Sequence, residues 1–128
     1  MKENIFIVDD SSQLRASVRH LLENEPGFQV CGEAIDGVDA VEKAGKLNPD
    51  LIVLDVSMPN MNGIEAAHAL RQLLPAVFII MFTMYKSRLA IAEAFAAGAN
   101  TVVFKGDGIG LLRAAHRLLA PGQLPRTA

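Results

Sequence analysis

Five polar side chains each follow directly on an apolar segment of the chain: Asp9 and Asp10, Asp55, Thr83, and Lys105. Carboxylates gathered in one cleft repel each other and raise a pKa unless a cation lies between them. Mg²⁺ prefers oxygen ligands and keeps positions open for phosphate oxygens. Beside such an ion a carboxylate can attack phosphorus to form an acyl phosphate, while an ammonium and a hydroxyl stabilise the transferring group. These residue types predict metal-assisted phosphoryl transfer to a carboxylate, if the fold brings them together.

The elements that must position these side chains begin with short apolar runs. Four runs are continuous and rich in β-formers, at residues 5–8, 51–54, 77–82 and 101–104. Such runs are typical of strands that are covered on both sides. Residues 28–34 are interrupted by Gln29 and Glu33, which predicts a less buried strand nearer the edge of a sheet.

Between these runs the apolar residues recur at helical spacing. Leu14, Val18 and Leu22 follow Ser11, whose hydroxyl suits a helix N-cap, and this helix should stop near residues 26–27. Further helices are expected after residues 36–37 and 62–63, the latter ending at Pro75, and before Gly98 and residues 121–122. The glycine-rich run at residues 106–110 predicts a flexible loop before the last helix.

Strict alternation of strand and helix, five times over, predicts an α/β fold. The expected architecture is a doubly wound (βα)5, flavodoxin-like three-layer sandwich with a five-stranded parallel sheet in the order 2-1-3-4-5. In such sheets ligands bind beyond the carboxyl ends of the strands, at the switch point between strands 1 and 3. Residues 1–120 are expected to form one domain, and residues 121–128 a C-terminal tail or linker stub.

The amino-acid composition indicates where this protein is located and what it does not bind. The 128 residues are 51% hydrophobic, carry a net charge of −2 and contain a single cysteine, Cys31. With no long apolar stretch and no cysteine pair, we expect a soluble, cytoplasmic protein with no membrane contact, and Cys31 as a buried small side chain. The few basic residues near the end, Arg113, Arg117 and Arg126, are expected on a solvated helix face. With a net charge of −2, no direct nucleic-acid binding is expected.

Several stretches resemble the receiver domains of bacterial two-component response regulators. They are residues 7–11 (Ile-Val-Asp-Asp-Ser), residues 51–63, the strand that ends in Thr83, and residues 98–105. The most specific part is Asp55 followed by Met58-Pro59 and then Gly63. The resemblance runs from residue 5 to about residue 119 and so covers nearly the whole chain.

The resemblance implies a role for each candidate residue. Asp55 would be the phosphoacceptor. Mg²⁺ would be bound directly by Asp10, Asp55 and the backbone carbonyl of Ser57, and through water by Asp9. Thr83 and Lys105 would contact the phosphoryl group. The protein would then accept its phosphoryl group from a sensor histidine kinase or a phosphotransfer protein in a phosphorelay. It would be a signalling phosphoacceptor that assists its own phosphotransfer and dephosphorylation, not an enzyme. A downstream protein or a second copy would bind the face of the fourth helix, fifth strand and fifth helix.

Some details point to a branch of the family, and others depart from its usual pattern. Residues 30–34, 82–84 and 120–122 are similar to the NarL/LuxR-type branch, whose receivers usually precede a helix-turn-helix. The sequence holds no such DNA-binding domain, so it is either a stand-alone receiver or a piece of a longer regulator. Val102 stands where the family usually has a switching aromatic ring, so switching is expected to be weaker or carried by the backbone around Thr83.

Side chains beside the expected site and on the helices bear on its access and its ligands. The bulk of Met84, which follows Thr83, is expected to narrow access to Asp55, whereas Tyr85 is expected to be an exposed loop side chain, with shielding of the phosphoryl group as the alternative. The histidines lie on three separate predicted helices and are expected at the surface: His20, His68 and His116.

Three other functions are alternatives to phosphoryl acceptance. An aspartyl-nucleophile phosphatase would need a second acid where Ser57 stands, and serine cannot act as that acid. A nucleotide binder would need a glycine-rich phosphate loop where Asp9 and Asp10 stand. A receiver-fold interaction module that works without phosphorylation is favoured by Val102 and the glycine-rich segment, but opposed by the presence of all the site residues.

Overall fold

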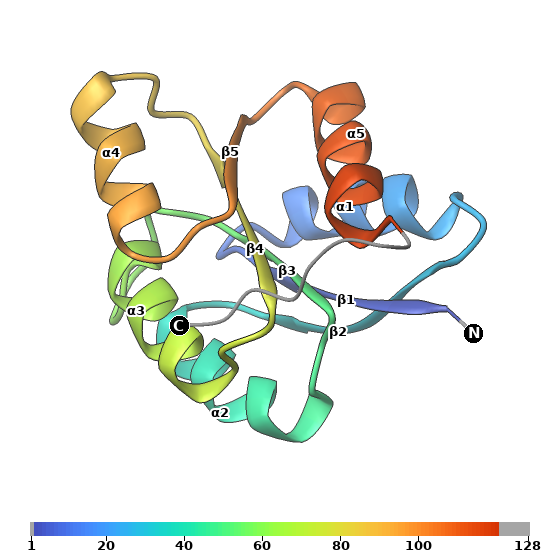
Figure 1. Ribbon diagram of the computed structural model, residues 1–128, viewed down its shortest axis with the longest axis horizontal. Helices are drawn as coiled ribbons and strands as arrows, with labels where there is room; N and C mark the ends of the chain where they lie inside the picture. Colours follow the sequence, from blue (N-terminus) through green and yellow to red (C-terminus); the bar gives the residue numbers. More distant parts are fainter. Residues whose placement is uncertain (1, 121–128) are drawn as a thin grey trace.

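The computed structural model describes residues 2–120, in which five strands alternate with five helices (Figure 1). The strands are β1 (Glu3–Val8), β2 (Phe28–Ala34), β3 (Leu51–Leu54), β4 (Phe78–Thr83) and β5 (Thr101–Phe104). The helices are α1 (Ser12–Glu23), α2 (Gly37–Leu47), α3 (Gly63–Leu73), α4 (Arg88–Ala96) and α5 (Gly108–Leu119). The predicted tail at residues 121–128, including Arg126, lies outside the described residues.

The strands form one parallel sheet in the order β2-β1-β3-β4-β5, which confirms the predicted topology. The register pairs Val8 with Leu54, and Leu54 with Met81. Strands β1 and β3 therefore end side by side, although they are separated by a long stretch of sequence. This register places Asp9 and Asp55 next to each other at the carboxyl edge of the sheet.

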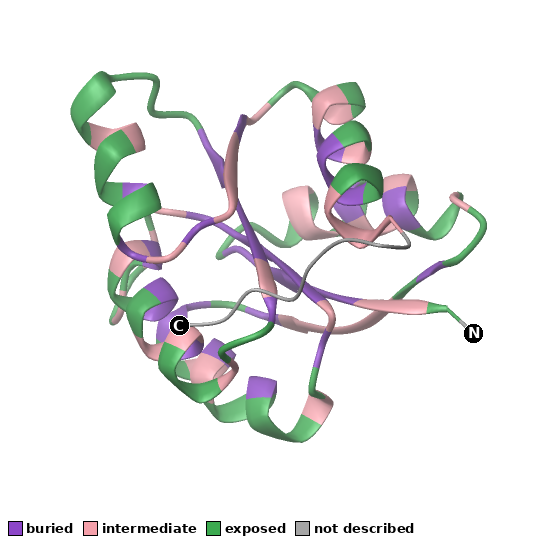
Figure 2. Cartoon of the chain, viewed as in Figure 1, coloured by how far each residue is buried: buried purple, intermediate pink, exposed green. Residues whose placement is uncertain are grey.

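Two helical layers cover the sheet, as Figures 1 and 2 show. Helices α1 and α5 pack on one face with Ile5 and Ile7 of β1, whereas α2, α3 and α4 pack on the other with Phe6 and Val8. Successive side chains of a strand point to opposite faces. Because both faces are covered, all four residues are buried, which explains why the run carries no polar alternation.

Side-chain caps set where the helices begin. Ser11, Asp36, Asn62, Ser87 and Asp107 each accept a hydrogen bond from a backbone N–H in the first turn of the helix that follows. Such caps satisfy donors that the helix itself leaves unpaired. The predicted N-cap Ser11 is thus confirmed.

The structure differs from the expected elements in a few places. The fourth strand ends at Thr83 as expected but begins at Phe78, one residue after the start of the apolar run, and α3 ends two residues before Pro75. The glycine-rich segment is mostly the first turn of α5: only Gly106 has a positive φ, of 95°, and a Cβ on Gly110 would overlap the capping carboxylate of Asp107. The loop is therefore shorter than its glycine content suggests.

Other expectations concern single residues and the membrane. Cys31 is half-buried and its thiol lies 3.5 Å from the Ile5 carbonyl oxygen, so it is less buried than predicted. The three histidines are exposed, as expected. Within residues 2–120, every helix is too short or too polar to span a bilayer.

Candidate functional site

Three carboxylates meet at the carboxyl edge of the sheet. Oxygen atoms of Asp9, Asp10 and Asp55 all lie within 4.8 Å of one another. Asp9 and Asp55 are only 3% and 4% exposed, whereas Asp10 is open to solvent. The Asp55 N–H donates to the Val8 carbonyl at 2.9 Å, which extends the β1–β3 ladder and fixes the backbone of Asp55. The predicted acidic cluster is therefore present.

Lys105 follows β5 and reaches across the sheet edge to this cluster. Its Nζ lies 2.9 Å from Asp9 Oδ2 and 3.0 Å from Asp55 Oδ1. Burial alone would lower the pKa of Lys105, but its hydrogen bonds to Asp9 and Asp55 outweigh this effect and raise that pKa. The amine is therefore a fixed positive charge between the two buried carboxylates.

One ammonium does not balance three carboxylates. Burial raises the pKa of Asp55, the hydrogen bond from Lys105 opposes that rise, and the negative charge of Asp9 adds to it, so the pKa stays above its ordinary value. Ionised Asp55 thus lacks full compensation in this environment. A donor set made only of oxygens with excess negative charge fits a hard divalent cation such as Mg²⁺.

Thr83 and Ser57 lie at the same edge of the sheet. Thr83 ends β4 beside β5, is 3% exposed, and its hydroxyl oxygen accepts the Tyr85 N–H at 3.0 Å. The Ser57 N–H is directed at Asp55 Oδ1, at 3.4 Å. Residues from four strand ends therefore converge on one region, as the alternation of strands and helices predicted.

A cleft of about 450 Å³ opens over the cluster. It is lined by Asp10, Asp55, Ser57, Met84, Tyr85 and Lys105. Two of these lining side chains, Met84 and Tyr85, are themselves 75% and 51% exposed. Tyr85 is exposed, as expected.

Arg15 contributes to the site, although sequence reasoning did not single it out. Its guanidinium donates to the Asp9 carbonyl at 2.8 Å and to Glu33 Oε1 at 2.9 Å. In the sequence, Arg15 is simply an arginine beside the apolar residues of the first helix, and its partners lie outside that helix. Contacts of this kind depend on tertiary structure, which explains why the pattern did not reveal them.

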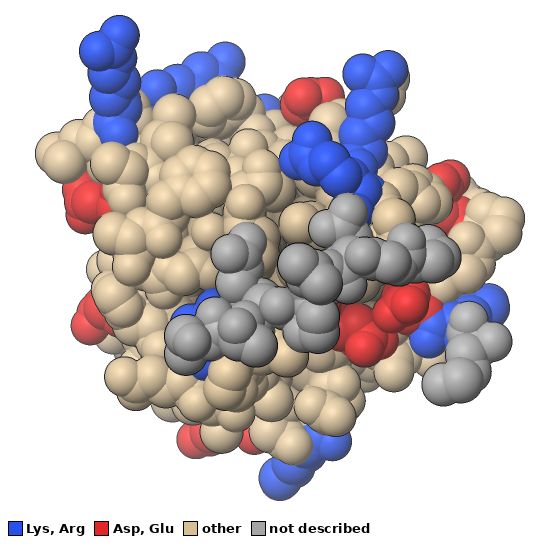
Figure 3. Space-filling view, viewed as in Figure 1, with Lys and Arg blue, Asp and Glu red and all other residues tan. Residues whose placement is uncertain are grey.

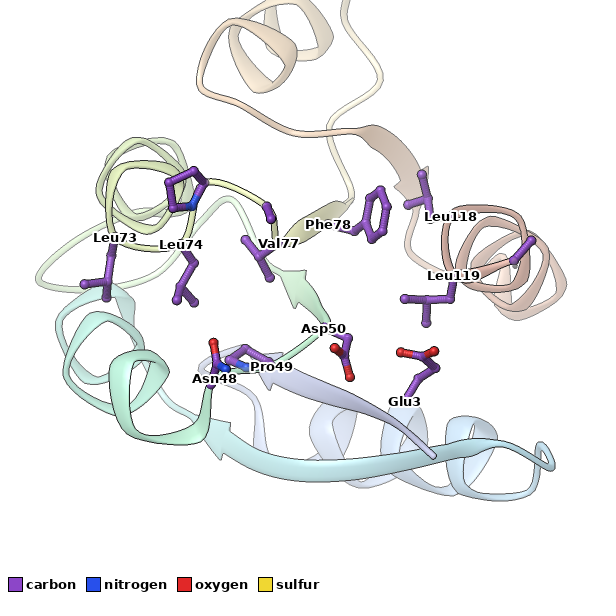
Figure 4. Close-up of a pocket in the computed structure, with 13 residues that line it drawn as sticks. Glu3, Asn48, Pro49, Asp50, Leu73, Leu74, Val77, Phe78, Leu118 and Leu119 are labelled. Atoms are coloured by element: carbon purple, nitrogen blue, oxygen red, sulfur yellow. The ribbon is translucent and has the colours of Figure 1, made fainter. Parts of the chain in front are cut away.

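The opposite edge of the sheet holds a second cavity, of about 520 Å³ (Figure 4). Two carboxyl groups, of Glu3 and Asp50, face it beside an apolar wall that includes Phe78 and Leu119. Burial and the nearby Asp50 raise the pKa of Glu3. No lysine borders this cavity among the described residues, so it lacks the amine that the candidate site has.

Basic side chains mark another part of the surface. Figure 3 shows lysine and arginine side chains standing out from the end of the molecule where α4 and α5 begin. Lys86 in the segment before α4, Arg88 of α4, and Arg113 and Arg117 of α5 are all exposed. Arg113 and Arg117 thus lie on the solvated helix face that the sequence predicted.

A five-stranded doubly wound sheet with an acidic cleft at its switch point defines the flavodoxin-like receiver fold. A family model for the response regulator receiver domain matches residues 5–117, and the chain belongs to this family. Members of the family are phosphoacceptors rather than classical enzymes, and the Asp9, Asp10 and Asp55 cluster is typical of their Mg²⁺ site. The resemblance stated from the motifs is confirmed at this level.

Similar proteins span several kinds of response regulator. A LuxR-family regulator from Aurantimonas sp. SI85-9A1 is 35% identical, with a TM-score of 0.89 over 100% of this chain and 90% of that chain. The chemotaxis protein CheY of Thermotoga maritima is 34% identical over 82% of this chain and 87% of its own length. CheY of Borrelia burgdorferi, solved as a CheX-CheY-BeF3-Mg²⁺ complex, is 26% identical, with a TM-score of 0.85 over 92% of this chain and 90% of that chain.

Other curated relatives are much longer than this chain. It spans 34% and 30% of the length of two protein-glutamate methylesterases, and 51% of the length of a transcriptional regulatory protein.

Proposed function

We propose that this protein is a receiver in a two-component phosphorelay and that it accepts a phosphoryl group on Asp55 in a Mg²⁺-dependent reaction. The donor is a sensor histidine kinase or a phosphotransfer protein. The observation that carries the proposal is the bridge from Lys105 to both Asp9 and Asp55, beside Asp10 in an open cleft. Buried carboxylates paired with one amine have little structural purpose at a solvent-open strand edge, but they suit phosphoryl transfer.

The transfer moves one phosphoryl group between two protein side chains. A carboxylate oxygen of Asp55 attacks phosphorus, and the bond from phosphorus to the donor's imidazole nitrogen breaks. The electron pair of that bond stays on the imidazole, and Asp55 becomes an acyl phosphate. The later reaction with water returns the Asp55 carboxylate and inorganic phosphate.

The carboxylates and one carbonyl would hold the metal ion. Asp10, Asp55 and the Ser57 backbone carbonyl are the proposed direct ligands, with Asp9 acting through water. Bound Mg²⁺ supplies positive charge that offsets the carboxylates and the incoming phosphoryl oxygens. Asp10 is exposed and Asp9 is buried, which agrees with a direct ligand at the cleft and an indirect one beneath it.

Lys105 and Thr83 are the proposed contacts of the phosphoryl group. The Lys105 ammonium already touches Asp55 Oδ1 and would stabilise negative charge on an adjacent phosphoryl oxygen. The Thr83 hydroxyl oxygen accepts the Tyr85 N–H, which leaves its own proton to donate to a second phosphoryl oxygen. Donation by Thr83 would link phosphorylation to the backbone at Tyr85.

Similar proteins support the metal and the class of function. The Borrelia CheY relative is described with BeF3 and Mg²⁺, and the Thermotoga relative is a chemotaxis protein. The similarity to a LuxR-family regulator supports placing this chain in the NarL/LuxR-type branch. We propose that the receiver unit spans residues 1–120.

The proposed output surface is the face formed by α4, β5 and α5. Leu89 and Phe95 of α4 are exposed large apolar side chains, and only Ala94 of that helix is buried. A second copy or a downstream protein would cover these side chains, and neither nucleic acid nor membrane is a proposed partner. Val102 of β5 is half-buried against the core, so switching would be carried by backbone movement around Thr83.

Incubation with Mg²⁺ and either acetyl phosphate or a phosphorylated histidine kinase tests the proposal. Intact mass spectrometry should show the gain of one phosphoryl group by the wild-type protein and no gain by D55A. A gain that survives in D55A would contradict the role of Asp55. No gain with either donor would favour the phosphorylation-independent interaction module.

A further inference from the structure

The loop between β3 and α3 carries Ser57 and is tied to the start of α2. The Asn60 side-chain amide donates to Asp36 Oδ2 at 2.7 Å. One residue further along each segment, the Gly37 N–H donates to the Met61 carbonyl at 3.0 Å. We call this pair of hydrogen bonds the α2 clip.

Both sides of the clip require particular residues. Asn60 has a φ of 66°, a left-handed conformation that asparagine, aspartate and glycine adopt most readily. A Cβ on Gly37 would lie 2.5 Å from the Met61 carbonyl oxygen, so a larger residue would push the loop away. The start of α2 and the loop after β3 therefore lie so close together that only glycine fits at position 37.

Asp36 is a well-satisfied carboxylate although it is only 7% exposed. Its Oδ1 caps α2 by accepting the Asp39 N–H at 2.8 Å, while its Oδ2 accepts from Asn60. These two contacts, the Asp39 N–H first, lower the pKa of Asp36. The carboxylate thus joins a helix N-terminus to the loop.

The other hydrogen bonds of this loop remain within the β3–α3 connection. The Met61 N–H donates to the Pro59 carbonyl at 2.8 Å, and the Gly63 N–H to the Val56 carbonyl at 2.7 Å. Within the described part of the chain, the clip supplies the hydrogen bonds that join residues 57–61 to another element. The place of the Ser57 carbonyl therefore depends on α2 as well as on β3.

We propose that Asp36 and Asn60 are positioning residues that hold the Ser57 carbonyl where it can bind Mg²⁺. This inference rests on the proposed function, in which that carbonyl is a direct ligand. Some groups orient a metal ligand without touching the metal, and removing such a group commonly weakens metal binding roughly 10- to 100-fold. The clip would thus set the Mg²⁺ affinity of the receiver from outside the cleft.

Three variants separate the clip from general damage to the fold. N60D tolerates the left-handed conformation but sets a carboxylate against that of Asp36. N60G removes the amide without backbone strain. The double variant D36N/N60D restores the hydrogen bond with donor and acceptor exchanged, keeps an oxygen to accept the Asp39 N–H, and has the net charge of the wild type.

Magnesium affinity is measured by titrating MgCl2 into each ¹⁵N-labelled protein, without a phosphodonor, and following the amide resonances. We expect N60D and N60G to bind Mg²⁺ about tenfold more weakly, and D36N/N60D to recover to within about threefold of the wild type. The added charge of N60D alone would strengthen binding, so a loss has the opposite sign to a simple charge effect.

Amide hydrogen exchange in the metal-free proteins gives a second readout. Exchange at Ser57 and Met61 should be faster in N60D and N60G, and return to the wild-type rate in the double variant. Unchanged Mg²⁺ affinity in both single variants, or a double variant as weak as N60D, would overturn the inference. A wild-type protein that binds no Mg²⁺ would instead contradict the proposed function itself.

Discussion

At the scale of single residues, the site depends on an imbalance of charge. Asp9 and Asp55 are buried with one shared amine, and the raised pKa of Asp55 shows that Lys105 only partly offsets burial and the charge of Asp9. A divalent cation bound at this cluster would offset the remaining negative charge. Lys105 is therefore central to the proposed transfer.

Replacing Lys105 by alanine should slow phosphorylation of the protein by about 10²- to 10³-fold, because one preorganised charge aimed at the transferring group is lost. The measurement is the initial rate of mass gain with acetyl phosphate and saturating Mg²⁺. The control is K46A, which removes an exposed lysine of α2 that lies outside the cleft. Equal rates for K105A and the wild type would show that this amine does not stabilise the transfer.

At the scale of elements, connections between strands and helices hold the site together. The loop after β3 is packed so closely that a Cβ on Gly63 would lie 2.0 Å from the Asp55 carbonyl oxygen. On the other side of the sheet edge, Arg15 links α1 to the Asp9 carbonyl and to Glu33 of β2. These contacts fix the backbone on which the carboxylates stand.

The variant G63A should destabilise the protein by about 2 to 3 kcal/mol, because the new methyl group meets backbone that cannot move aside cheaply. G45A is a matched control, since Gly45 lies exposed within α2 and a Cβ there meets only Leu73 at 3.8 Å. It should stabilise the protein by about 0.5 to 1 kcal/mol. Urea unfolding measures both, and equal stability of the two variants would refute the close approach at Gly63.

Glu33 gives the structure a pH-dependent link between α1 and β2. Burial alone would raise the pKa of Glu33, but hydrogen bonds from Arg19 and Arg15 outweigh it and lower that pKa. A carboxylate with a lowered pKa stabilises the fold above its unfolded pKa, about 4.3, and this contribution is lost as the pH falls through the folded value.

The variant E33Q should therefore be less stable than the wild type at pH 7, by about 1 kcal/mol for partly exposed ion pairs. The difference should shrink as the pH falls below about 4.3. Thermal unfolding across this pH range measures it, with E42Q, an exposed site on α2, as the control. A difference between E33Q and wild type that does not change with pH would argue against the ion pairs as its source.

At the scale of the whole molecule, hydrophobic patterning predicted the alternation of strands and helices, and the strand order followed from the common order of five-stranded doubly wound sheets. Continuous apolar runs identified β1 and β3 because both faces of the sheet are covered, and the topology then brought Asp9 and Asp55 together. Alternation of elements fixes which ends share an edge, even without knowledge of any contact.

The contacts that support the site were not predictable in the same way. The bond from Arg15 to the Asp9 carbonyl and that from Asn60 to Asp36 join segments whose relative placement no local pattern encodes. Gly110 looked like part of a flexible loop but lies in the first turn of α5, where its missing side chain leaves room for the Asp107 cap. The local sequence pattern therefore predicted the candidate site residues but not the contacts that hold them in place.

The central claim is that Asp55 carries the phosphoryl group, and chemical trapping locates that group most directly. The protein is phosphorylated with Mg²⁺ and acetyl phosphate, treated with sodium borohydride, which reduces an aspartyl phosphate to homoserine, and digested for peptide sequencing by mass spectrometry. Homoserine should be found at position 55 alone, and only when Mg²⁺ was present. Homoserine at position 9 or 10, or a phosphoryl group retained on a histidine with position 55 unmodified, would contradict the account.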